Sequence, residues 1–132
     1  MKVSRELAEQ EVTQWLDEKK VFQSTREAYK DSIDLLVDAI CEGVLKYDGD
    51  KKKFIHTLLF PLGGEIPITE LIYKQRLTDK ELRPNLNGVK QGDGDGRLNA
   101  YVAALTSTNK EIVANLDSAD KKIAMAISIF FL

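Results

Sequence analysis

The last third of the chain holds three short helical segments with almost no loop between them. Thr108 stands three residues before Glu111, and Asp117 stands three before Asp120, which is typical of helix N-caps followed by an acidic third residue. Each cap would satisfy amide groups that a new helix leaves without partners. The caps therefore predict helices near 98–106, 109–115 and 118–131, and they restrict this region to compact helix packing.

The final helix of this cluster is apolar on two sides. At about 100° per residue, one side carries Ile123, Ile127 and Phe130, and the roughly opposite side carries Met125, Ile129 and Leu132. Two interpretations stay open: a small core surrounds the helix, or one side packs within the chain while the other contacts a partner. The uncharged run is far shorter than the about 20 residues that span a bilayer, which argues against membrane insertion.

Composition excludes several functions. A chain of 132 residues predicts one domain, 1–132, able to bury a core without metals or disulfides. A net charge of -2 provides no basic surplus to neutralise phosphates, so we expect no nucleic-acid partner. Cys41 is the single cysteine, and the N-terminus lacks the apolar core of a signal peptide, which together favour a cytoplasmic location.

Residues 1–50 predict two helices. The first runs from about Arg5 to Lys19 after Ser4 as a possible cap, with Trp15 in its modest apolar stripe and the lysine pair at its end polar. Ser24 and Glu27 have the spacing of a capping box for a second helix, which has one buried face and is closed by 48–50.

The middle of the chain changes to strand periodicity. Residues 54–60 and 68–75 are rich in β-favouring residues and flank a turn at 61–67, so the sequence predicts a β-hairpin. Two strands alone are marginally stable, and one face must pack on helices or pair with another chain, which makes self-association possible. His56, the only histidine, is interpreted as an ordinary face residue. The predicted fold class is α+β, mainly helical, with two N-terminal helices, a central β-hairpin and a cluster of short C-terminal helices.

No pattern in the sequence predicts catalysis, a metal site or a cofactor. Thr78 and Glu81 form a capping box for a short helix that should end near Pro84, and residues 87–96 predict a flexible loop. The Asp-Gly-Asp-Gly run does not fit a calcium loop, because Val102 falls where the bidentate glutamate belongs. Asp93 and Asp95, the strongest candidates for catalytic acids, lie in this loop. We therefore expect a protein that is not an enzyme.

Residues 54–131 resemble the tail assembly chaperones of long-tailed bacteriophages. The segment ITELIYKQRLTDKELRP matches a strand that runs into a capped helix. The segment AYVAALTSTNKEIVANLDSADKKIAMAISIFF matches a helix ending in AALT, then a short helix and a capped final helix. The chain departs from the family in residues 1–50, since many relatives begin close to the hairpin.

The resemblance implies a non-enzymatic function in the cytoplasm of the infected bacterial host. Such chaperones bind the tape measure protein, a long and aggregation-prone helical chain, and keep it soluble while the tail tube assembles. The alternative is a structural tail component, of the completion or baseplate type, that stays in the virion. The tail tube protein and a second copy of the chain are further possible partners. We hypothesise that partner contacts involve Met125, Ile129, Phe131 and Leu132.

Overall fold

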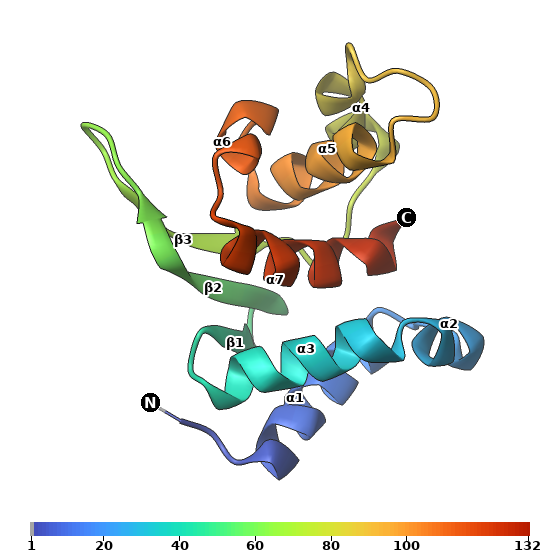
Figure 1. The fold of residues 1–132 in the computed structure, drawn as a ribbon. Coiled ribbons are helices and arrows are strands. Elements are labelled where there is room, and N and C mark those ends of the chain that lie inside the picture. The colour runs from blue at the N-terminus through green and yellow to red at the C-terminus, as the bar shows by residue number, and fades with distance from the viewer. Residues whose placement is uncertain (1) are drawn as a thin grey trace.

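Helices begin and end the chain, and a small sheet lies between them in sequence. The structure is a computed structural model that describes residues 2–132. In that range, three helices precede three strands, and four more helices and a final 3-10 turn follow (Figure 1). The predicted α+β, mainly helical fold class is therefore confirmed.

Helix α1 (Arg5–Glu18) begins where the sequence predicts. The Ser4 side chain accepts a hydrogen bond from the Leu7 amide at 3.3 Å, which satisfies one amide of the first turn. The buried face of the helix comprises Ala8, Val12, Trp15 and Leu16. The predicted apolar stripe is confirmed, including the assignment of Trp15 to packing.

Two helices, α2 (Gln23–Ala28) and α3 (Lys30–Cys41), occupy the region where one was expected. The predicted capping box at Ser24 is wrong, because Phe22 is the N-cap and Ser24 lies inside α2. The backbone leaves the helical region at Tyr29, whose ring packs edge-on against Phe130 with centroids 5.7 Å apart. The break between α2 and α3 thus places Tyr29 against Phe130, about a hundred residues later in the chain. A contact between such distant residues cannot be predicted from a local sequence pattern.

Helix α3 ends earlier than expected, and a strand follows that the sequence analysis missed. Gly43 adopts φ 79°, a left-handed conformation that glycine reaches without strain, and the chain then enters β1 (Leu45–Asp48). The Asp48 carboxylate accepts hydrogen bonds from the Asp50 and Lys51 amides at 3.0 and 3.2 Å. Residues 48–50 thus turn the chain from β1 into β2 and do not close a helix.

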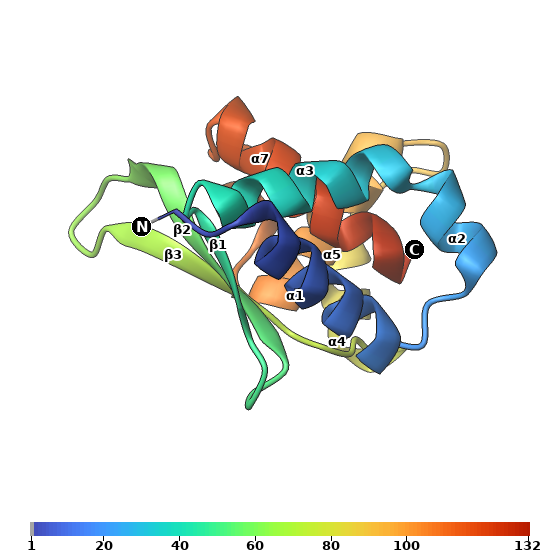
Figure 2. The ribbon, with the colours of Figure 1, turned by 90° about the horizontal axis from the view of Figure 1, so that it is seen from below.

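The three strands form an antiparallel sheet in the order β1-β2-β3, with β2 (Lys53–Leu62) in the centre and β3 (Ile68–Tyr73) at one edge. The predicted hairpin is present, and β1 adds a third strand to it. Phe54, His56 and Leu58 alternate on the buried face of β2. Figure 2 shows the helices gathered on one side of the sheet, while the far end of the β2–β3 hairpin extends away from them.

Helix α4 (Asp79–Leu86) has the predicted capping box, because the Thr78 and Glu81 side chains each accept a hydrogen bond from the other residue's amide. It continues to Leu86, beyond the expected end near Pro84, since a proline there removes only one bond of the helix. Helix α5 (Gly94–Thr106) begins inside the predicted loop. The Asp93 side chain caps it by accepting from the Gly96 amide at 2.9 Å.

Two short segments complete the helical cluster. Helix α6 (Lys110–Ala114) is capped by Asn109, and the predicted cap at Thr108 is wrong because its hydroxyl contacts Thr106 Oγ1 at 2.8 Å. Helix α7 (Ser118–Ser128) has the predicted Asp117 cap, and its last residues continue as a 3-10 turn, η1 (Ile129–Phe131). At Thr108, a local contact to the neighbouring threonine replaces the predicted cap.

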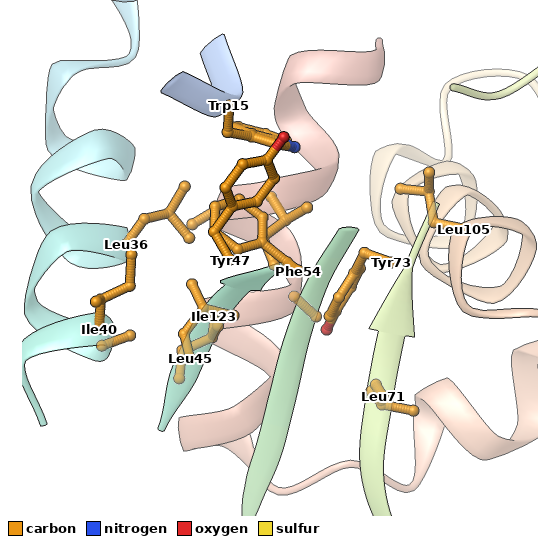
Figure 3. Packing of buried hydrophobic residues seen from close by; sticks show 14 of the residues in the cluster. Trp15, Leu36, Ile40, Leu45, Tyr47, Phe54, Leu71, Tyr73, Leu105 and Ile123 are labelled. Atoms are coloured by element: carbon orange, nitrogen blue, oxygen red, sulfur yellow. The ribbon is translucent and has the colours of Figure 1, made fainter. Parts of the chain in front are cut away.

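One hydrophobic core joins the N-terminal helices, the sheet and the C-terminal helices. Trp15 packs against Phe54 and Phe130, with ring centroids 4.8 and 5.6 Å apart. Figure 3 shows residues of α1, α3, all three strands, α5 and α7 meeting in this core. Residues 1–50 and 54–132 thus share their buried surface, and α7 lies between α3 and α5 (Figure 1).

Candidate functional site

Helix α7 has one buried side and one partly open side. Ile123 and Ile127 are buried, and Phe130 is half-buried against Trp15 and Tyr29, so this side packs within the chain. Met125 and Ile129 are half-buried on the opposite side. The two sides that helical periodicity predicts for this helix are therefore distinct in the structure. The side with Ile123 and Ile127 is buried, and the side with Met125 and Ile129 is partly accessible.

Two adjoining hollows lie along the open side of α7. The first, of about 210 Å³, lies over Leu35 of α3, Leu98 of α5 and Ala126 of α7. The second, of about 250 Å³, lies between α5 and α7. Met125 and Leu98 line both hollows, and Ile129 lines the first. We call these two hollows together the α7 groove.

Two lysines mark the N-terminal end of this groove. Lys122 is exposed and lines the first hollow, which has no acidic lining residue. Lys121 lines the second, opposite Asp95. Neither lysine forms an ion pair within residues 2–132. The groove thus combines an apolar floor with positive charge at one end.

Asn99 adds an unsatisfied polar atom to the second hollow. Its Oδ1 is buried and has no hydrogen-bond partner in the part of the chain that the structure describes. A buried amide oxygen without a partner costs free energy, so this position lowers the stability of the chain.

The four residues predicted to contact a partner do not all lie on this groove. Met125 and Ile129 line it, and Leu132, 59% exposed, follows on the last turn. Phe131 lies elsewhere: its ring packs near Trp15, with centroids 6.3 Å apart, and the Lys19 ammonium sits 3.4 Å from its centroid. Leu35, Leu98, Lys121 and Lys122 complete the groove and were not among the predicted contacts.

A buried polar cluster fixes the beginning of α7, and the sequence analysis missed it. Asp120 accepts hydrogen bonds from the Leu59 and Phe60 amides at 2.8 and 3.0 Å, and its Oδ1 lies 3.1 Å from His56 Nε2. His56 Nδ1 lies 3.0 Å from the Tyr73 hydroxyl. Because a carboxylate accepts, Nε2 carries the proton and Nδ1 accepts from Tyr73. His56 is therefore not an ordinary face residue but the centre of a buried network.

This cluster explains an irregularity in the sheet. The pairing of β2 with β3 shifts register between Thr57 and Leu62, so the amides of Leu59 and Phe60 turn toward Asp120. Both side chains then point outward and are 49% and 56% exposed. The Asp120 carboxylate of α7 thus accepts the two amide hydrogen bonds that the irregular part of β2 cannot make within the sheet.

Burial sets the ionisation of the cluster. Burial lowers the pKa of His56, although the neighbouring Asp120 opposes this shift. Burial also raises the pKa of the Tyr73 hydroxyl. His56, Tyr73 and Asp120 are all buried, so we interpret the cluster as a structural link between α7 and the sheet. The sequence does contain a signal for this cluster. His56 alternates with the apolar Phe54 and Leu58, so it faces the core, and a buried histidine needs hydrogen-bond partners.

A second polar cluster lies under the end of α7. Lys19 is 7% exposed and donates a hydrogen bond from Nζ to the Gln75 carbonyl oxygen at 3.1 Å. Burial, together with repulsion from Arg76, lowers the pKa of Lys19 to about 8. The sequence analysis left this lysine among the polar surface residues, and that assignment is wrong.

Within residues 2–132, no three His, Cys, Asp or Glu side chains gather closely enough to hold a metal ion. No helix in that range has both the length and the apolar character needed to cross a bilayer. Asp93 and Asp95 lie at the start of α5, where Asp93 is used as a helix cap.

Comparisons with protein-family models, with curated proteins and with solved structures gave no match to this chain.

Proposed function

We propose that this chain is a non-enzymatic tail assembly chaperone of a long-tailed bacteriophage, acting in the cytoplasm of the infected host. Its partner in this proposal is the tape measure protein, which it keeps soluble while the tail tube forms. The observation that carries the proposal is the α7 groove, an open apolar strip on a helix whose opposite side holds the buried Ile123 and Ile127. Grooves of this kind receive amphipathic helices, and the tape measure protein is a long helical chain.

Methionine at the centre of the groove supports a chaperone role. Met125 lines both hollows, and its flexible side chain can adapt to partner side chains of different shape. A chaperone for a long chain must accept many similar segments instead of one sequence. The groove is short, which suits repeated weak contacts along such a partner.

Co-expression with the tape measure protein of the same phage tests the proposal. The measured quantity is the fraction of tape measure protein that stays soluble and co-purifies, with the unmodified chain and with Met125→Asp plus Ile129→Asp. We expect recovery with the unmodified chain and loss with the double variant. Leu7→Asp is the matched control, because Leu7 is also apolar and 54% exposed but lies on α1. No recovery with any of these chains would refute the chaperone function.

A structural tail component is the alternative, and the projecting hairpin favours it. Phe60 and Ile66 are 56% and 87% exposed near its tip, where their side chains could be covered by a permanent neighbour. Mass spectrometry of purified virions distinguishes the two functions. A chaperone should be absent from complete particles, whereas a structural component should be present at a fixed copy number.

A further inference from the structure

We infer that the α7 groove selects an amphipathic helix with acidic residues flanking its apolar face. The inference rests on the proposed function only for the identity of the natural partner. Its geometric basis is the first hollow, where the apolar floor of Leu35, Leu98 and Ile129 meets Lys122 and no carboxylate.

The apolar floor accounts for the helical part of the inference. Leu35, Leu98 and Ile129 come from three different helical segments. The hollow is therefore an open groove between helices. An apolar side chain of a partner helix fits such a crevice, and its neighbour one turn away would lie across Met125 toward the second hollow.

The charge of the groove accounts for the acidic part. Lys121 and Lys122 follow each other at the N-terminal end of the groove, one in each hollow, and neither has an ion-pair partner in residues 2–132. Asp95 partly offsets Lys121, but no acidic residue lines the hollow beside Lys122. A glutamate next to the apolar anchor of the partner would therefore gain an attraction, and a lysine there would be repelled.

Two synthetic peptides test this selectivity without the tape measure protein. Both are amphipathic helices of one length with the same leucine face, but one carries glutamates beside that face and the other carries lysines. Fluorescence anisotropy measures their dissociation constants with the full chain. We expect the glutamate peptide to bind about fivefold more tightly, which corresponds to one exposed ion pair. Equal affinities, or tighter binding of the lysine peptide, would overturn the inference.

Charge reversal locates the preference. Lys122→Glu should abolish or invert the preference for the glutamate peptide, because Lys122 is exposed and its replacement leaves the fold intact. Lys80→Glu, an exposed lysine on α4, makes the same charge change away from the groove and should leave the preference unchanged. A preference that survives Lys122→Glu would place the binding site elsewhere and overturn the inference.

Further outcomes separate this inference from the proposed function. Sedimentation equilibrium of the chain alone shows whether a second copy occupies the groove; a dimer that Lys122→Glu dissociates would overturn the assignment to a foreign helix. Peptide selectivity without rescue of the tape measure protein would keep the groove and reject the chaperone function. Rescue of the tape measure protein without peptide selectivity would keep the function and reject the groove.

Discussion

Each end of α7 lies next to a buried charged residue, but the surroundings of the two residues differ. Asp120 lies in the first turn of the helix, and Lys19 lies next to Phe131, just beyond its last turn. Asp120 is fully buried and faces three donors, from His56, Leu59 and Phe60. Lys19 has one carbonyl oxygen and an aromatic face, and the neighbouring Gln75 side chain has no partner for either of its polar atoms. The first end of the helix is fastened by a complete network, whereas the second retains unpaired groups that reduce stability.

The largest expected effect is loss of the Asp120 network. Asp120→Ala leaves the buried His56 and the two part-buried amides of Leu59 and Phe60 without their acceptor, and it should lower the free energy of unfolding by about 3–5 kcal/mol. Urea denaturation followed by circular dichroism measures it. Asp117→Ala is the matched control, because Asp117 caps the same helix at an exposed position and should cost about 1 kcal/mol. Equal losses in the two variants would mean that the buried network contributes no more to stability than an exposed helix cap.

This network also shows what the sequence could not predict. The caps at Ser4, Thr78 and Asp117 are local, so their residue spacing predicts them correctly. His56 and Asp120 are 64 residues apart, and only the folded chain brings them to 3.1 Å. The acidic third residue of the last helix was recognisable in the sequence, but its use as a partner for a strand was not.

The candidate site was predictable in part for the same reason. Helical periodicity alone separates Met125 and Ile129 from the buried Ile123 and Ile127. The opposite wall of the groove is formed by residues of α3 and α5. No local sequence pattern predicts that these two helices pack beside α7. Phe131 lies apart from the groove because the helix tightens into η1 after Ser128, which rotates the last side chains away from α-helical positions.

Lys19 should produce the next largest effect, visible as a pH dependence. Its pKa falls from 10.5 to about 8 on folding, so the unfolded chain binds more protons between these values. The free energy of unfolding should therefore rise with pH across this window, by up to about 3 kcal/mol. Lys19→Met should remove that rise, and Lys80→Met, at an exposed position, should retain it. Urea denaturation at pH 7.5, 9 and 10.5 measures both; a rise that persists in Lys19→Met would refute this origin.

His56 should act at acidic pH, with a smaller effect. Its pKa is lowered on folding, so the folded state favours the neutral ring and stability is lost as pH falls below about 6.5. One proton limits the slope to about 1.4 kcal/mol per pH unit. His56→Gln should show a shallower decline between pH 7 and 5 than the unmodified chain, in thermal melts at each pH. A steeper decline in His56→Gln would mean that Asp120 stabilises a charged ring.

Gln75 should give the smallest effect, and it tests the comparison most directly. Both polar atoms of its side chain are buried without a partner, while its carbonyl oxygen still receives the Lys19 hydrogen bond. Gln75→Leu removes the two unpaired atoms and keeps a side chain of similar size, so we expect a stability change between zero and a gain of about 1 kcal/mol. Gln75→Ala is the control, because it removes the same atoms but leaves a cavity and should destabilise the chain. Calorimetric melting temperatures measure both variants. A loss of more than about 1 kcal/mol in Gln75→Leu would mean that the amide has a partner in solution, and the end of α7 would then be as well paired as its beginning.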